Sequence, residues 1–129
     1  MAINYSTILP HGFNLIEKIY PNPNDEWKKL IEAMKLVAKE IYEVDPQVII
    51  IASPHNLRID GQIGIITSEW IEGIWWNDEK TKKAELKFKI DRNTSNLIYQ
   101  RAKMMDLPIV AVNYGAAEGE YSSMKMDWG

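Results

Sequence analysis

The sequence predicts an α/β fold in which a mostly parallel or mixed central sheet is flanked by helices. Short apolar runs rich in β-branched residues, such as residues 48–53, are bounded by prolines, which is typical of strands buried on both faces of a helix-covered sheet. Between such runs, apolar residues recur every three to four positions, as in an amphipathic helix. A helical crossover of this length joins parallel strands, almost always right-handedly.

The composition is that of a soluble globular chain, and we expect residues 1–129 to form a single domain. The net charge is −3 and no basic stripe stands out, so we expect no nucleic-acid partner and no anionic membrane partner. The chain contains no cysteine, which excludes disulfides, thiolate metal ligands and a cysteine nucleophile. It has no signal-peptide pattern and no bilayer-spanning apolar stretch, so we expect a cytoplasmic location.

The first half of the chain predicts a strand, a helix and a second strand. Residues 3–9 form the first strand candidate. Asn24 is a good N-cap for a helix, and Asp45-Pro46 ends that helix. Residues 48–53 follow as the second strand, so this half reads as one strand–helix–strand unit. The helix carries an apolar stripe at Trp27, Leu30, Ile31, Met34, Val37, Ala38, Ile41 and Val44.

The second half predicts a further strand–helix–strand unit. Residues 62–68 are a strand candidate, and residues 84–90 alternate between apolar and charged side chains, as expected for a half-exposed strand that is antiparallel or lies at a sheet edge. Asp91 or Asn93 can cap a helix of about a dozen residues that Leu107-Pro108 stops. Residues 109–113 are then a short buried strand that closes the unit.

Two stretches give no secondary-structure prediction. Residues 69–77 hold Trp70, Trp75 and Trp76, which either pack in the core or line an aromatic pocket or a subunit contact; we favour packing. Residues 114–129 lack a periodic pattern, and we expect an irregular tail.

The chain has two histidines, and each follows a predicted strand and a proline. His11 stands in Pro10-His11-Gly12, and His55 stands in Ser53-Pro54-His55. Ligands of open α/β sheets bind beyond the carboxyl ends of the strands, so both imidazoles could share one metal ion there. The alternative is that each is an ordinary surface or hydrogen-bonding loop residue. Spacing alone assigns no catalytic and no substrate-binding residue.

These segments resemble the class III extradiol ring-cleavage dioxygenases, the family of the protocatechuate 4,5-dioxygenase β subunit and the dopa dioxygenases. The resemblance rests on Pro10-His11-Gly12, on the long helix and on the run from Ile49 to His55. Residues 126–129 are similar to the family's Asp-His-Gly segment, although Trp128 replaces the histidine. The match covers essentially the whole chain but only about the first half of a family member.

The resemblance implies a non-haem Fe(II) held by His11 and His55, with Zn²⁺ as the other candidate metal. It implies an oxidoreductase that cleaves a catechol-type ring with O₂. The family's glutamate ligand and acid–base histidine have no counterpart here, so we expect the chain to be incomplete or inactive by itself. The alternative is a non-catalytic α/β module that binds a metal or a partner.

We also expect a homodimer or higher oligomer, because half of such a domain leaves an apolar face or a sheet edge to be covered. A dimer could lend the carboxylate of Glu118 or Glu120 to the histidines of its partner.

Overall fold

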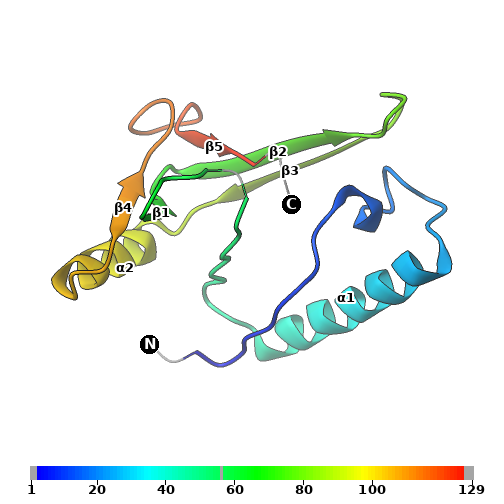
Figure 1. Cartoon of the computed structure of the whole chain (residues 1–129), viewed down its shortest axis with the longest axis horizontal. Coiled ribbons are helices and arrows are strands. Elements are labelled where there is room, and N and C mark those ends of the chain that lie inside the picture. Colours follow the sequence, from blue (N-terminus) through cyan, green and yellow to red (C-terminus); the bar gives the residue numbers. More distant parts are fainter. Residues whose placement is uncertain (1–2, 56, 127–129) are drawn as a thin grey trace. The chain divides into compact units, whose positions relative to one another are not determined.

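The computed structural model describes residues 3–55 and 57–126 (Figure 1). The chain divides into two compact units. The first unit contains the residues up to Ala52 together with Trp75–Ala84, and the second contains Ser53–Ile74 and the residues from Glu85 onward. The expectation of a single domain stays a prediction.

The predicted α/β class is confirmed, since the described residues form two α-helices and two sheets. The parallel sheet pairs two strands, and the mixed sheet has three in the order β3-β2-β5. The helical segments are η1 (Phe13–Leu15), α1 (Asp25–Val44) and α2 (Arg92–Met104). The strands are β1 (Ile63–Ile66), β2 (Trp70–Trp76), β3 (Lys83–Lys89), β4 (Ile109–Val112) and β5 (Ser123–Lys125). Within residues 3–55 and 57–126, no helix has the length and apolarity needed to cross a membrane.

Helix α1 begins and ends where the sequence predicts. The side chain of Asn24 accepts a hydrogen bond from the backbone N–H of Trp27 at 2.9 Å, and this satisfies a donor that the first turn leaves free. Asp45 terminates the helix in the left-handed region at φ 48°. The apolar stripe is only partly covered, because Ile31 alone among the described side chains of α1 is fully buried.

The core of the first unit forms where the chain before α1 meets the turn-side ends of β2 and β3. Ile19 is 2% exposed and packs with Trp75 and Ala84. Ile16 and Tyr20 border this cluster. The packing role predicted for the tryptophans is therefore confirmed for Trp75.

The second unit places α2 against the parallel pair of β1 and β4. Asp91 is the N-cap of α2: its carboxylate accepts hydrogen bonds from the backbone N–H groups of Asn93 and Thr94. Asp91 also accepts the Thr94 hydroxyl proton at 2.9 Å. Of the two predicted caps, the structure therefore selects Asp91.

The expected second strand–helix–strand unit does not lie within one sheet, because β4 pairs with β1 while β3 belongs to the other sheet. The edge position expected for residues 84–90 is confirmed, since β3 lies at the edge of that sheet beside β2. The physical reason is the alternation of β3, whose lysine face suits an edge strand and not a doubly buried one. β2 and β5, which the sequence did not predict, complete that sheet in parallel register.

The two strands expected at residues 3–9 and 48–53 are absent from the described ladders, which corrects the prediction. Ile49, Ile50 and Ile51 are 60%, 63% and 71% exposed, where the sequence predicted burial on both faces. β-branched residues favour extended backbone, but a strand also needs a hydrogen-bonding neighbour.

Leu86 and Phe88 of β3 alternate as predicted, yet they are 53% and 56% exposed.

Candidate functional site

The two predicted metal ligands lie in different units. His11 belongs to the first unit, where it is exposed and directly precedes the turn into η1. His55 belongs to the second unit, where it is half-buried and its backbone N–H donates to the Ser53 hydroxyl at 3.2 Å. A common site for the two imidazoles stays a prediction.

The described residues do not build a complete metal site. Among them, no group of three or more His, Cys, Asp or Glu side chains could hold an ion. Two neutral imidazoles suit Fe(II) as donors, but the facial arrangement of the dioxygenase family needs a carboxylate as well. Glu118 and Glu120 lie exposed in the turn between β4 and β5, and residues 127–129 fall outside the described part.

A polar cluster that sequence reasoning missed lies at the carboxyl ends of β1 and β4. Ser68 and Ser122 are both 0% exposed, and each donates its hydroxyl proton to Oδ1 of Asn113, at 3.1 and 3.2 Å. The Ser68 hydroxyl also accepts from the backbone N–H of Tyr114 at 2.9 Å. The Ser122 hydroxyl accepts from the backbone N–H of Glu69 at 3.1 Å. These bonds tie the exits of both parallel strands to the start of β5.

The turn that delivers Ser122 depends on a glycine. Gly115 has φ +80° and bridges to Ser122. A Cβ at this position would lie 2.1 Å from the backbone oxygen of Tyr121, which no real side chain tolerates. The close approach of the two chain segments therefore requires glycine here.

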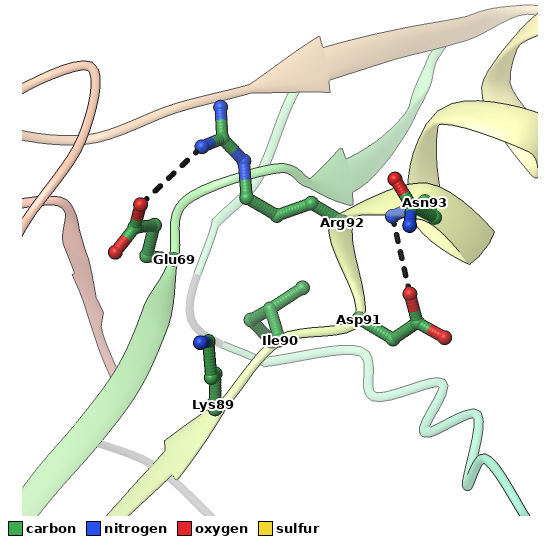
Figure 2. A pocket seen from close by; sticks show the side chains of 6 residues that line it. All are labelled: Glu69, Lys89, Ile90, Asp91, Arg92 and Asn93. Atoms are coloured by element: carbon green, nitrogen blue, oxygen red, sulfur yellow. Dashed lines mark hydrogen bonds and ion pairs between the residues drawn. The ribbon is translucent and has the colours of Figure 1, made fainter.

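A pocket of about 440 Å³ opens beside this cluster (Figure 2). It is bounded by the residue that leads into β2 and by the segment between β3 and α2. Its wall contains two cations and two carboxylates. Figure 2 shows Arg92 reaching across the pocket toward Glu69, with Arg92 Nη1 3.6 Å from Glu69 Oε1. The lining residues are Glu69, Lys89, Ile90, Asp91, Arg92 and Asn93.

Charged groups also surround Trp70 on the same unit. The Lys87 and Lys89 ammonium nitrogens lie 5.2 and 5.9 Å from the centre of the Trp70 ring, within the range of cation–π attraction. Glu72 receives a hydrogen bond from Lys125 and an ion pair from Lys87. The Lys125 hydrogen bond, followed by the Lys87 contacts, holds the pKa of the Glu72 carboxyl below its usual range.

A signal for the missed cluster was present in the sequence. Ser68 ends the strand predicted at residues 62–68, and Asn113 ends the buried strand predicted at residues 109–113. The rule that ligands gather at strand carboxyl ends applies to these polar residues as it does to the histidines. The contribution of Ser122 had no such signal, because β5 is three residues long and its partner β2 was not expected.

No family model matches the chain, and no solved structure matches it. A protein of Clostridium acetobutylicum named Protein CA_C1420 is 22% identical over 129 residues, which are 100% of this chain and 27% of the relative. The chain thus spans about a quarter of the length of the curated relative it matches.

Proposed function

We propose that this chain supplies two histidine ligands, His11 and His55, to a non-haem Fe(II) centre of the class III extradiol dioxygenase type. The observation that carries the proposal is that the chain's only two histidines each follow an extended apolar segment and a proline, in the arrangement that resembles that family. The third ligand, a glutamate in the family, would come from outside the described residues. A catechol-type ring and O₂ are the substrates proposed for the completed centre, and the cytoplasm is its proposed location.

The chemistry of the donors supports an iron centre of this kind. Neutral imidazole is a good ligand for divalent iron, and two imidazoles with one carboxylate leave coordination positions open for a substrate and O₂. When bound, the metal would supply the electron transfer from catecholate to O₂. The contribution of this chain would be to hold the ion from the Pro10-His11 and Pro54-His55 turns.

A second function, a non-catalytic module that binds a partner, is favoured by a separate observation. Large apolar side chains stand exposed, among them Ile50 in the first unit and Phe88 in the second. Ile49, Ile50 and Ile51 are all exposed and follow one another in the chain, and an exposed apolar patch marks an interaction site in soluble proteins. The two functions are compatible, because a partner that covers such a surface could also carry the third ligand.

Thermal unfolding with added Fe(II) under anaerobic conditions tests the metal proposal. An ion that binds the folded chain raises Tm by mass action. We expect a rise in the wild type that is lost in His55→Ala and in His11→Ala. Gln62→Ala, which changes a polar side chain after the His55 loop, is the control and should keep the rise. Equal rises in the wild type and both histidine variants would refute a site at these residues.

Oxygen uptake separates the two functions. A dioxygenase centre consumes O₂ only when both Fe(II) and a catechol are present, whereas a partner-binding module consumes none. If the reading frame continues past Gly129, the same assay on the extended polypeptide tests the origin of the third ligand. Catechol-dependent uptake by the extended polypeptide, lost on His55→Ala, is the result that the proposal requires.

A further inference from the structure

The pocket beside the polar cluster of the second unit is lined by neither of the two histidines, and its lining residues are mostly charged. Arg92, Lys89 and Asn93 bring hydrogen-bond donors to its wall. The carboxylate of Asp91 is already occupied, since it accepts from two backbone N–H groups and from the Thr94 hydroxyl. Of the two carboxylates that line the pocket, Glu69 is the one that lies beside Arg92, a donor that lacks a full set of hydrogen-bond acceptors among the described residues.

Arg92 in particular has more donors than acceptors. A guanidinium carries five N–H donors, but the nearest carboxylate oxygen lies 3.6 Å from Nη1, which is longer than a hydrogen bond. Nε is buried without a hydrogen-bond partner among the described residues. Arg92 lines the pocket, and a third of its side chain, 34%, remains exposed, although this part does not include Nε. Buried donors in folded proteins are normally satisfied, and an unsatisfied one calls for an acceptor.

The backbone holds Arg92 at this place. Asp91 caps α2, so Arg92 is the first residue of the helix, and its N–H donates to the backbone oxygen of Ile90 at 3.0 Å. Ile90 in turn donates its N–H to the backbone oxygen of Glu69 at 2.8 Å. Because Ser122 also receives the N–H of Glu69, both walls of the pocket are fixed by hydrogen bonds within the unit.

We propose that this pocket binds a small organic carboxylate between the Arg92 guanidinium and the Lys89 ammonium. The planar fork of a guanidinium matches the two coplanar oxygens of a carboxylate, and a lysine adds a second positive charge without a fixed geometry. Glu69 competes for Arg92 when the pocket is empty and is displaced from it when the ligand enters. The site does not use the helix N-terminus, because Asp91 already occupies those N–H groups.

Acetate is the probe, and chloride at equal ionic strength is its matched control. In a titration followed by amide chemical shifts, acetate should move the backbone signals of residues 89–93 saturably, and chloride should not. R92Q should weaken acetate binding about tenfold or more, whereas K103Q, which removes a positive charge from the exposed end of α2, should leave it unchanged. E69Q should tighten it, because the competing carboxylate is gone.

R92K keeps the positive charge but removes the planar guanidinium, so it tests whether the guanidinium geometry is needed for acetate binding. It should lose the preference for acetate over chloride and should retain the chemical-shift pattern of a folded chain. The proposal is overturned if acetate and chloride shift the same amides equally in the wild type. It is also overturned if R92Q and R92K, folded by that same criterion, bind acetate as the wild type does.

Discussion

Ser68 and Asn113 are joined by a hydrogen bond of 3.1 Å, although they are 45 residues apart in the chain. Each stands just beyond the carboxyl end of one strand of the parallel pair, Ser68 after β1 and Asn113 after β4. The bond therefore closes the edge of the sheet at which α/β proteins bind their ligands. Ser122 donates to the same Asn113 oxygen, so this one side-chain amide connects the carboxyl ends of both parallel strands to the start of β5.

Ser68→Ala should destabilise the chain by about 1–3 kcal/mol, because it removes two part-buried hydrogen bonds, one from the backbone N–H of Tyr114 and one to Asn113. Urea unfolding followed by tryptophan fluorescence measures the effect. Ser6→Ala, the same change at an exposed position, should stay within about 0.5 kcal/mol of the wild type. Equal midpoints for the two variants would show that the cluster contributes no stability.

Two isoleucine truncations should differ sharply. Ile19 is 2% exposed in the core of the first unit, so Ile19→Ala should cost about 2–5 kcal/mol. Ile50 is 63% exposed, and Ile50→Ala should change the free energy of unfolding by less than about 0.5 kcal/mol. Denaturant midpoints of both variants provide the comparison. A large loss for Ile50→Ala would instead support the buried strand that the sequence predicts.

The cap of α2 should give the chain a defined acid sensitivity. The backbone hydrogen bond from Thr94, then its hydroxyl bond, lower the pKa of the Asp91 carboxyl below its ordinary value. A depressed pKa stabilises the fold fully above the unfolded value, about 3.9, and this stabilisation is lost as the pH falls through the folded value. Asp91→Asn retains a capping oxygen but does not titrate.

The Tm difference between wild type and Asp91→Asn, followed by far-UV circular dichroism, should therefore shift in favour of the variant below about pH 4. Glu72 also has a lowered pKa, but it is present in both proteins and cancels in this comparison. A Tm difference that stays constant from neutral to acidic pH would contradict the assigned cap.

The chain should self-associate at micromolar concentration. Leu86 and Phe88 stand on one face of an edge strand with more than half of each side chain exposed. Apolar surface on an edge strand recruits a second chain, and a two-fold dimer is the simplest closed assembly. Light scattering should give a mass above that of one chain, and Leu86→Lys with Phe88→Lys should lower it. A monomer of 14.9 kDa in the wild type would refute the prediction.

Local signals in the sequence predict the helices and three of the strands. Asn24 and Asp91 each carry a side chain that satisfies the first free N–H groups of a helix, so the helix starts follow from local chemistry. The runs that become β1 and β4 are short and apolar, and they are flanked by turn residues. The strict alternation before Asp91 predicts β3.

Pairing between distant segments is not predictable in this way. Whether Ile50 is buried depends on which strand lies beside it, and residue type alone does not supply that neighbour. The same limit explains why β5 was not predicted, since it is a three-residue strand that follows a glycine turn. For the candidate sites, residue type predicts the metal-ligating chemistry of His11 and His55. The pocket at Arg92 forms because Glu69, just before β2, lies beside the start of α2, and the sequence does not predict that contact.

An anaerobic calorimetric titration with Fe(II) measures whether His11 and His55 bind one ion together, as proposed. We expect one ion per chain in the wild type. Because both ligands serve the same ion, His11→Ala and His55→Ala should each weaken binding about tenfold or more, which is about 1.4 kcal/mol. The double variant should lose little beyond either single one, since the site is already broken. Unchanged binding in either single variant, or losses that simply add, would contradict a shared site.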